Sequence, residues 1–420
     1  LFGEGVETTN KVSLNVTWTK QAEISIVKND KDTGNHLAGA IYGVYRDKES
    51  SDLITQMPET DKKGASKVTI EKTQDVCSVL AVAQQEANYQ ADPTVYPVDV
   101  NIGKTSTKNV LNERTYAKIH LIKEDAETGA NPQGDATLEG AVYGLYAREN
   151  IVHPDGTTGI VHRAGDLVST LKVDQKGDAV VKDLYLGKYF VKEIQAPEGY
   201  LLDETEHDVE CSYEGGTVPT IERTVKSTEL VMKQPFQIIK VANNGQTDAD
   251  LLKGAGFSAY LKSSLEKKED GSYDFSHAEP VILTADGKTE MLTDEKGYAC
   301  SIPLPYGTYI VRETTTPHNY KPVEDFEITI SENNPDKPQV WKVLLDKEFS
   351  AKLKIIKKDD ETKKPVLVAG TEFKIYDLDH KKYVEQVTTY PTVTVHKSFF
   401  TDSQGYLILP KNLEIGHYRI

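Results

Sequence analysis

The sequence predicts an all-β fold, a tandem array of Ig-like β-sandwich modules. Short segments of alternating apolar and polar residues are separated by frequent turn signals, and no long segment has the period of a helix. A lysine-bearing strand followed by a Gly-small-x-aromatic-x-x-Tyr segment occurs four times, with its lysines at Lys28, Lys123, Lys240 and Lys357. Successive copies are about 100 residues apart, the size of a small domain, so one module is repeated along the chain.

Module two shows the elements of one repeat most clearly. Residues 117–123 (AKIHLIK) alternate with period two and predict the first strand, and residues 140–146 (GAVYGLY) predict the second. Residues 183–193 (DLYLGKYFVKE) predict a tight turn and a later strand, which residues 196–200 (APEGY) end with strong breakers. An Asp-x-x-Gly turn at residues 174–177 recurs in the other copies, and the repeated tyrosines are expected to pack in the core.

The repeat sets the predicted boundaries. Residues 1–19 resemble the last strand of a preceding module, and modules one to four are expected at residues 20–114, 115–232, 233–348 and 349–420. The linkers are short and contain no Gly/Ser-rich or Pro-rich spacer, which predicts semi-rigid joints and a rod. The chain starts without methionine and stops within a strand pattern, so we interpret it as a fragment whose fourth module is truncated.

Charge and cysteine content limit the classes of partner. The net charge of −16 disfavours nucleic acid and anionic membranes, because both bind basic surfaces. No apolar run reaches transmembrane length, so no membrane insertion is expected. Cys77, Cys211 and Cys300 lie one in each of the first three modules, which excludes a disulfide within a module.

No cofactor or metal site is expected. The turn at residues 30–34 carries oxygen ligands but lacks the longer acidic set and closing glutamate of a calcium loop. Residues 103–106 (GKTS) are similar to the end of a phosphate loop, but Val98 occupies the place of its first glycine. The ten histidines are scattered, and no Ser/His/Asp arrangement can be inferred, so an enzyme acting on an external substrate is not predicted.

The lysine strand, the Gly-Ala-x-Phe/Tyr strand, and the Gly-x-Tyr-x-x-x-Glu segment followed by Ala-Pro-x-Gly-Tyr resemble a known family. They are similar to the prealbumin-like modules of Gram-positive pilins and surface adhesins, the SpaA or Cna B type, over nearly the whole chain. The resemblance implies an extracellular location on the cell wall. It also implies, for many such modules, a spontaneous amide bond between a first-strand lysine and a last-strand Asn or Asp, assisted by a buried Glu or Asp.

This chemistry is physically consistent with a buried site. An amine attacks only when it is neutral, and burial among apolar strands lowers the pKa of a lysine. A protonated carboxylic acid nearby can polarise the acceptor carbonyl and shuttle protons, and burial raises the pKa of such an acid. Fixed proximity then replaces an external enzyme.

Module three matches the pattern of the family in full. The resemblance assigns Lys240 and Asp346 to the cross-link and Glu313 to the proton shuttle. The alternative for these residues is an unbonded, ion-paired cluster. Module four has Lys357, but the chain stops before the expected glutamate.

Modules two and one depart from the pattern. Module two has Lys123 and Glu193, but Glu229 stands where the family has Asn or Asp, and its neighbours Ser227 and Thr228 are no better acceptors. A bond is therefore not expected there unless the strand register shifts. Module one also has candidate cross-link residues. Lys28 lies in its first strand, and Asn112 lies at the acceptor position before the next lysine strand.

The acid is what module one lacks. Counting from the flanking turn and tyrosine places Leu80 or Val82 where the glutamate should be, and Glu86 is too close to the tyrosine. The sequence therefore predicts no bond in module one, or a very slow one.

Two functions from different classes remain open. The first is a structural stalk of a surface protein anchored to peptidoglycan as part of a longer chain. The second is an adhesin that binds a host protein or glycan through loop insertions at residues 261–279 and 148–165. No Leu-Pro-x-Thr-Gly or Tyr-Pro-Lys motif occurs, so polymerisation into a pilus is not supported by the sequence.

Overall fold

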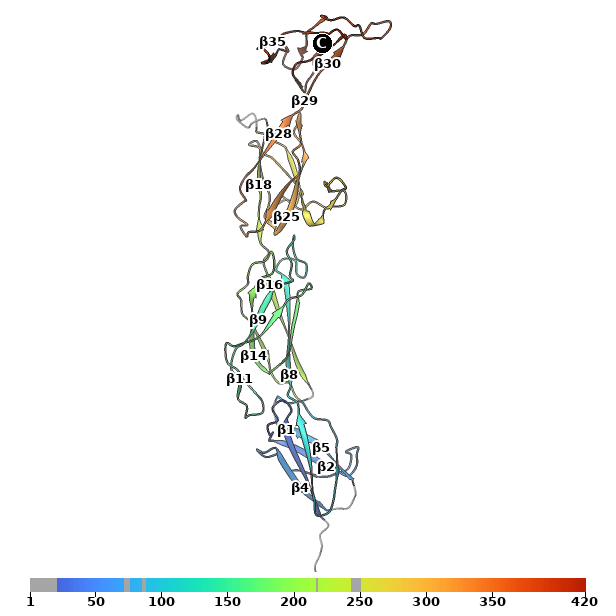
Figure 1. Ribbon diagram of the computed structural model, residues 1–420. Helices are drawn as coiled ribbons and strands as arrows, with labels where there is room; N and C mark the ends of the chain where they lie inside the picture. Colours follow the sequence, from blue (N-terminus) through green and yellow to red (C-terminus); the bar gives the residue numbers. More distant parts are fainter. Residues whose placement is uncertain (1–20, 72–75, 85–87, 217, 243–250) are drawn as a thin grey trace, which may run out of the picture. The chain divides into compact units, whose positions relative to one another are not determined.

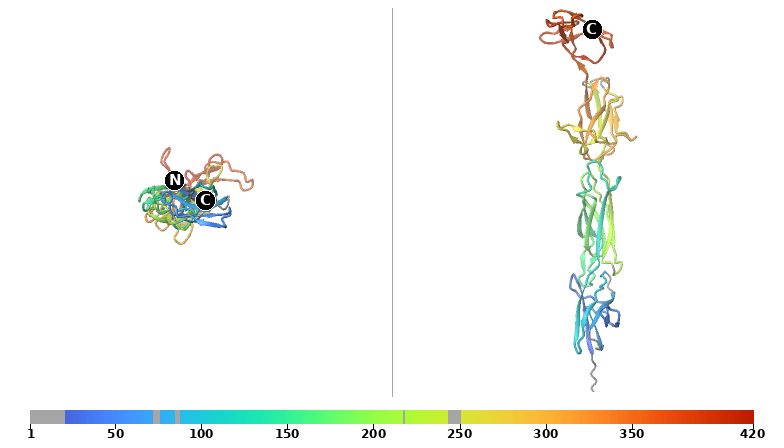
Figure 2. Two further views of the ribbon diagram at one scale, coloured as in Figure 1. Left: turned by 90° about the horizontal axis from the view of Figure 1, so that it is seen from below. Right: turned by 90° about the vertical axis from the view of Figure 1, so that its right-hand side faces the viewer.

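The computed structural model describes residues 21–71, 76–84, 88–216, 218–242 and 251–420. The strand expected within residues 1–19 and Glu86 lie outside this set. The chain divides into two compact units, Leu1–Asn131 with Leu138–Glu198 and Leu202–Glu229, and Pro132–Thr137 with Gly199–Leu201 and Leu230–Ile420. Both units are all-β, as predicted, and their strands can be followed in Figure 1 and in the two further views of Figure 2.

Module one, in the first unit, has sheets with the strand orders β4-β1-β7 and β3-β2-β5-β6. The first strand pairs antiparallel with β4 and parallel with β7, so the first and last strands of the module are neighbours. Its strands are β1 (Gln21–Asp30), β2 (Ala40–Tyr45), β3 (Leu53–Gln56), β4 (Ala65–Glu71), β5 (Val76–Gln84), β6 (Tyr96–Asp99) and β7 (Thr105–Asn112).

Module two repeats this plan with sheets β13-β8-β16 and β12-β9-β14-β15. Its first strand again pairs in parallel with the last, β8 with β16. A hairpin of β10 and β11 falls within the insertion at residues 148–165. The strands are β8 (Tyr116–Asp125), β9 (Val142–Ala147), β10 (Ile151–Val152), β11 (Ile160–His162), β12 (Leu167–Lys172), β13 (Asp178–Leu184), β14 (Gly187–Gln195), β15 (His207–Cys211) and β16 (Thr220–Glu229).

Module three, in the second unit, has sheets β23-β18-β28-β26 and β22-β19-β25-β27, again with a parallel first and last pair, β18 and β28. Its insertion contains the short 3-10 helix η2 (Lys262–Ser264) and a β20-β21 hairpin. The strands are β17 (Lys233–Gln234), β18 (Gln237–Ala242), β19 (Gly256–Leu261), β20 (Glu266–Lys267), β21 (Tyr273–Asp274), β22 (Glu290–Leu292), β23 (Tyr298–Cys300), β24 (Leu304–Pro305), β25 (Gly307–Thr315), β26 (Tyr320–Lys321), β27 (Phe326–Ile330) and β28 (Lys342–Glu348).

Module four forms only two- and three-stranded sheets around a small core that contains Ile375, Phe399, Leu407 and Leu409. Its strands are β29 (Ser350–Ala351), β30 (Lys354–Ile356), β31 (Glu372–Phe373), β32 (Tyr376–Asp377), β33 (Lys382–Tyr383), β34 (Gln386–Thr388), β35 (Thr394–His396), β36 (Phe399–Phe400), β37 (Tyr406–Ile408), β38 (Leu413–Glu414) and β39 (Tyr418–Arg419). No helix in the described ranges is long and apolar enough to cross a membrane.

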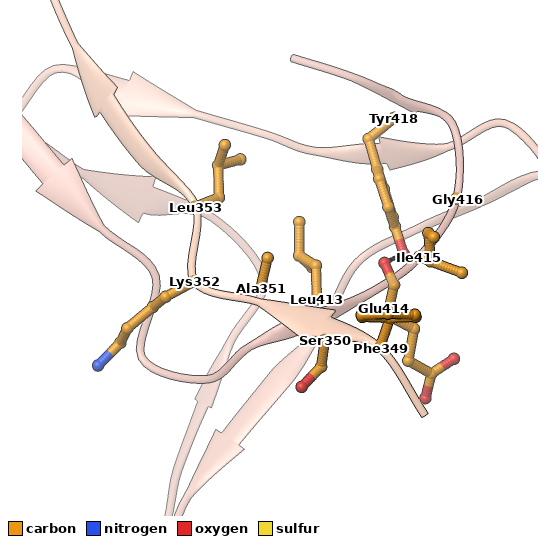
Figure 3. A pocket seen from close by; sticks show the side chains of 10 residues that line it. All are labelled: Phe349, Ser350, Ala351, Lys352, Leu353, Leu413, Glu414, Ile415, Gly416 and Tyr418. Atoms are coloured by element: carbon orange, nitrogen blue, oxygen red, sulfur yellow. Dashed lines mark hydrogen bonds between the residues drawn. The ribbon is translucent and has the colours of Figure 1, made fainter. Parts of the chain in front are cut away.

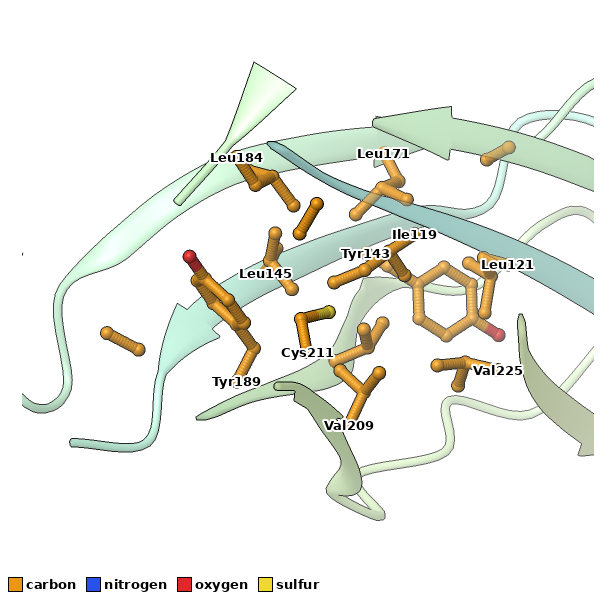
Figure 4. Close-up of a cluster of buried hydrophobic side chains, with 14 of the residues drawn as sticks. Ile119, Leu121, Tyr143, Leu145, Leu171, Leu184, Tyr189, Val209, Cys211 and Val225 are labelled. Atoms are coloured by element: carbon orange, nitrogen blue, oxygen red, sulfur yellow. The ribbon is translucent and has the colours of Figure 1, made fainter. Parts of the chain in front are cut away.

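The core of module two lies between its two sheets and shows why the strands form as they do. Alternate residues of β8 are buried, and Ile119 and Leu121 meet Tyr143 and Leu145 of β9 from the other sheet (Figure 4). Period-two burial of this kind is expected for a strand with one face on a core. Cys211 is a free thiol in the same core, and burial raises its pKa to about 11.

The glycine of the repeated Asp-x-x-Gly turn holds the lysine strand in place. Gly177 accepts a hydrogen bond from the backbone N–H of Lys123 at 2.8 Å, and Gly297 accepts one from Lys240 at 2.7 Å. Both glycines have a positive φ, and a Cβ on either would collide with the carbonyl oxygen of that lysine. Gly64 takes the same place in module one, so the turn repeats because each lysine strand needs this close contact.

Within the first unit, modules one and two meet around Arg114, whose side chain is almost fully buried. Its guanidinium donates to the Asp32 carboxylate at 2.9 Å and to the carbonyl oxygens of Leu184 at 2.9 Å and Asp183 at 3.0 Å. Two tyrosine rings lie against the guanidinium, with centroid distances of 4.3 Å for Tyr116 and 3.9 Å for Tyr185.

The insertion of module two takes part in the same contact. Asp155 accepts hydrogen bonds from Thr33 at 3.1 Å and from Asn35 at 2.9 Å, both in the first turn of module one. Although burial alone would raise the pKa of Asp155, hydrogen bonds from Thr158, Asn35 and the Thr157 N–H lower it well below its usual range. This insertion therefore has a structural role inside the chain.

Replacing Arg114 by alanine is expected to loosen this contact. The carbonyl oxygens of Leu184 and Asp183 would lose a buried hydrogen-bond donor, which costs about 2 kcal/mol. The amides of the turn that contains these two residues should then exchange roughly 30-fold faster. Hydrogen exchange on the full chain would measure the effect. Arg148→Ala is the matched control, because Arg148 also stacks on a ring and pairs with carboxylates but is much more exposed, so it should change protection little. Equal effects of the two substitutions would contradict the assignment.

Candidate functional site

Three lysines, Lys28, Lys123 and Lys240, are buried inside their modules, at 2%, 0% and 0% exposure. Each continues the inward-facing series of its strand, as Lys123 follows Ile119 and Leu121 at period two. A lysine is almost never fully buried unless its ammonium group has a partner. The surroundings of each lysine therefore decide what it can do.

In module three the structure brings together the three residues that the sequence assigned to one site. The Lys240 ammonium group donates to Glu313 Oε2 at 2.7 Å and also contacts Asp346 Oδ1. The side chains of all three residues are fully buried. The same oxygen of Glu313, Oε2, also accepts a hydrogen bond from the backbone N–H of Val323 at 2.9 Å.

The two sheets supply different parts of this site. Strands β18 and β28 pair in parallel, with Lys240 opposite Leu344 and Ala242 opposite Asp346, so the amine and the acceptor carboxyl come from one sheet. Glu313 lies on β25 of the other sheet, paired with Phe257. The acid therefore reaches the lysine from across the core.

Electrostatics at this site favour a neutral acceptor. Burial raises the pKa of Asp346 to about 6, although Lys240 acts to lower it. Glu313 Oε1 and Asp346 Oδ2 are buried and have no hydrogen-bond partner among the described residues. A buried carboxylate oxygen without a donor is costly, whereas an amide at Asp346 would no longer contain the second oxygen.

Module two contains the same arrangement with a different acceptor. Lys123 donates to Glu193 Oε1 at 3.1 Å and also contacts Glu229 Oε1, and all three side chains are buried. Glu229 lies opposite Asp125 on the parallel β8-β16 pair, the register that places Asp346 opposite Ala242 in module three. No shift of register is needed to bring Glu229 to the lysine.

The acid of module two is tuned by its buried neighbours. Burial, together with the nearby Glu229, raises the pKa of Glu193 to about 7, against the lowering effects of the Asp203 N–H and of Lys123. Glu193 can therefore hold a proton near neutral pH, as a proton shuttle requires.

Module one has the lysine and an amide acceptor, but in the part of the module that the structure describes no acid is paired with the tyrosine of the second strand. Asn112 is buried opposite Asp30 on the parallel β1-β7 pair, and its Nδ2 has no hydrogen-bond partner among the described residues. The residue paired with Tyr42, as Glu193 is paired with Tyr143, is Ala81.

The two positions expected from the sequence, Leu80 and Val82, are therefore wrong by one residue each. Leu80 pairs with Gly43. Ala81 lies one residue farther from the turn glycine and one residue farther from the following tyrosine than Glu193 does in module two, so a count along the chain misses it from both sides. An alanine therefore occupies the place that Glu193 has in module two.

Module four has a less enclosed lysine. Lys357 is only half-buried, and its ammonium group donates to Thr371 Oγ1 at 3.4 Å. A hollow of about 390 Å³ in this module is lined by Leu353, Leu413 and Tyr418 among others (Figure 3). Its lining is mainly aliphatic and aromatic, and it lies apart from any buried lysine and carboxyl pair that the structure describes.

Two buried hydroxyl groups of module two were not foreseen as part of the site. Tyr143 donates to Glu229 Oε1 at 2.6 Å and is hydrogen bonded to Ser227 Oγ at 2.9 Å. Burial and the hydrogen bond to Glu229 raise the pKa of Tyr143 far above its usual value. The repeated aromatic position was visible in the sequence, but module three has Phe257 there, so the repeat alone did not indicate a polar role.

The chain is similar to one family of known domains. The family model described as SpaA, a prealbumin-like fold domain, matches residues 117–224 and 234–342, together just over half of the chain. No curated protein matches the chain.

Several solved structures are similar to it. The Bacillus anthracis TIE protein is 23% identical with a TM-score of 0.51, and the match covers 78% of this chain and 51% of that protein, so this chain spans about half of its length. The Streptococcal ancillary pilin is 18% identical, with a TM-score of 0.27 and coverage of 78% and 99%. BcpA, the major pilin subunit of Bacillus cereus, is 14% identical, with a TM-score of 0.28 and coverage of 79% and 100%.

Proposed function

Because this chain belongs to the SpaA family of prealbumin-like fold domains, we propose that it is a structural stalk segment of a bacterial cell-surface protein. Module three contributes an internal amide cross-link between Lys240 and Asp346, formed without an external enzyme. The segment is anchored to the cell wall as part of a longer chain. The names of the similar solved structures, which include two pilins, support a surface location.

The observation that carries this proposal is the buried group of Lys240, Glu313 and Asp346. The amine and the acceptor carboxyl are in contact, and the acid lies 2.7 Å from the amine. Such proximity makes the condensation an intramolecular step with a high effective concentration.

The reaction balances without a co-reactant. A proton first passes from the Lys240 ammonium to the Asp346 carboxylate, which leaves a neutral amine and a carboxylic acid. Lys240 Nζ then attacks Asp346 Cγ to form the C–N bond, and Glu313 supplies the proton with which the hydroxyl leaves as water. Glu313 recovers a proton from the nitrogen, so it acts as the proton shuttle.

The position of the bond explains its value to a stalk. It joins β18 to β28, the first and last long strands of the module, at places 106 residues apart in the chain. Tension that enters at one end of the module would leave at the other through the amide. Everything between the two residues is then protected from unravelling.

The alternative, an adhesin that binds a host protein or glycan through the insertions, has weaker support. The insertion of module two is engaged with module one through Asp155. The insertion of module three is fixed to its own sheet, because Phe275 packs on Tyr260 and on the Arg312 guanidinium at 3.8 Å. Deleting residues 262–279 would abolish binding of a host ligand by an adhesin and would leave a stalk unaffected.

Intact-mass measurement of the denatured full chain tests the cross-link. We expect a mass lower than the sequence mass by at least one water, and a branched peptide that joins Lys240 to Asp346 after proteolysis. Asp346→Asn is the matched variant, because its bond would release ammonia instead of water. Linear peptides alone at these positions would refute the bond.

A further inference from the structure

We propose that Lys123 and Glu229 form a second internal amide cross-link, in module two, with a glutamate as acceptor and Glu193 as its proton shuttle. The inference rests on the function proposed for module three and extends it to an acceptor that the sequence pattern had excluded. The side chains that surround Lys123 in the structure support this cross-link.

The two glutamates of module two lie at the same positions as the acceptor and the acid of module three. Glu229 occupies the place of Asp346, since each lies on the last strand, two residues beyond the residue that pairs with the lysine. Glu193 likewise occupies the place of Glu313, paired with the aromatic residue of the second strand. The acceptor side chain of module two is therefore one methylene group longer than that of module three, while the backbone pairing is the same.

The Glu229 side chain reaches the amine of Lys123. The longer side chain of Glu229 still ends in contact with the Lys123 amine, and its Oε1 accepts a hydrogen bond from the Tyr143 hydroxyl at 2.6 Å. That donor would polarise the acceptor carbonyl and stabilise negative charge on its oxygen during attack. The second oxygen, Oε2, is buried without a hydrogen-bond partner among the described residues, and it is the oxygen that would leave.

The charges enclosed in this site also favour condensation. One ammonium group and two carboxyl groups are enclosed here, with side-chain exposures of 0% for Lys123, 0% for Glu193 and 1% for Glu229. Burying an ion pair carries a large desolvation cost that its mutual attraction often fails to offset. Condensation removes both charges of the pair, because the amide is neutral, and Glu193 remains as a neutral acid.

The covalent step is a condensation with no change of oxidation state. After proton transfer from the Lys123 ammonium to the Glu229 carboxylate, Nζ attacks Cδ and the C–N bond forms. Glu193 protonates the departing hydroxyl, the C–O bond breaks and water leaves. The surplus proton on nitrogen returns to Glu193, so the products are one amide and one water.

The test is the intact mass of the denatured full chain, combined with peptide mapping. The wild-type chain is expected to be lighter than its sequence by two waters, one for each of modules two and three. Glu229→Ala should restore one water and should remove only the branched peptide that contains Lys123. Glu222→Ala, an exposed glutamate on the same strand, should leave both branched peptides in place.

The outcomes separate this inference from the proposed function. Loss of one water mapped to Lys240 and Asp346 alone overturns the second cross-link and leaves the first. Loss of one water mapped to Lys123 and Glu229 alone does the reverse, and an unshifted mass overturns both. Because the wild-type peptide map decides the question, a variant that fails to fold does not remove the test.

Discussion

Replacing Ala81 by glutamate is expected to make module one cross-link itself. Ala81 is paired with Tyr42 and packs against the core, at the place of Glu193 in module two. A carboxyl group there would face Lys28 and Asn112, the two reacting groups that module one already contains. General acid–base catalysis contributes about 100-fold to 10,000-fold in rate, enough to turn an inert pair into a reacting one.

The product is a Lys28–Asn112 amide, and its signature is the loss of one ammonia from the intact mass of the full chain. Ala81→Gln is the matched control, because it has the same size and polarity but cannot shuttle a proton. Ala81→Asp offers a shorter acid if the glutamate disturbs the core. A folded Ala81→Glu protein with the same mass as the parent would show that an acid at this position is not sufficient to form the bond in module one.

Replacing Glu313 by glutamine is expected to leave module three folded but without its cross-link, and much less stable. A covalent link between residues 106 apart restricts the unfolded chain, which in the chain-entropy model is worth about 5 kcal/mol. For a domain of this size that corresponds to a fall of roughly 20–30 °C in the unfolding temperature.

Fluorescence can follow this module within the full chain. The sequence contains two tryptophans, Trp18 and Trp341, so a Trp18→Phe background leaves Trp341, beside β28, as the reporter. Asp346→Asn should keep the high transition temperature, because the asparagine still serves as an acceptor. Equal transitions for Glu313→Gln and the parent would mean that module three owes no stability to a bond made with this acid.

Much of the fold follows from the sequence because strand periodicity is a local property. The inward series Ile119, Leu121 and Lys123 already indicates which face of β8 is buried, and the repeated turn glycine marks where β13 begins. The parallel pairing of first and last strands is not local. It follows from the packing of the whole sandwich, which only the structure shows.

The sites were predictable to a lesser degree, because they depend on contacts between residues far apart in the sequence. Lys240, Glu313 and Asp346 were assigned through a known pattern, and the structure places them together. The acid position of module one was misplaced because module one has one more residue than module two on each side of Ala81, which the structure pairs with Tyr42. Glu229 was set aside on residue type, although side-chain reach and burial decide whether it can meet the lysine.

The parallel neighbours β18 and β28 also set an order of events during synthesis. A chain that emerges from its N-terminus presents Lys240 first and Glu313 later, and Asp346 arrives last. Until β28 has docked beside β18, the lysine has its acid but no acceptor. A bond at this place would therefore form only after the whole module has folded. The presence of the amide in a given molecule would then show that module three of that molecule had reached its folded state.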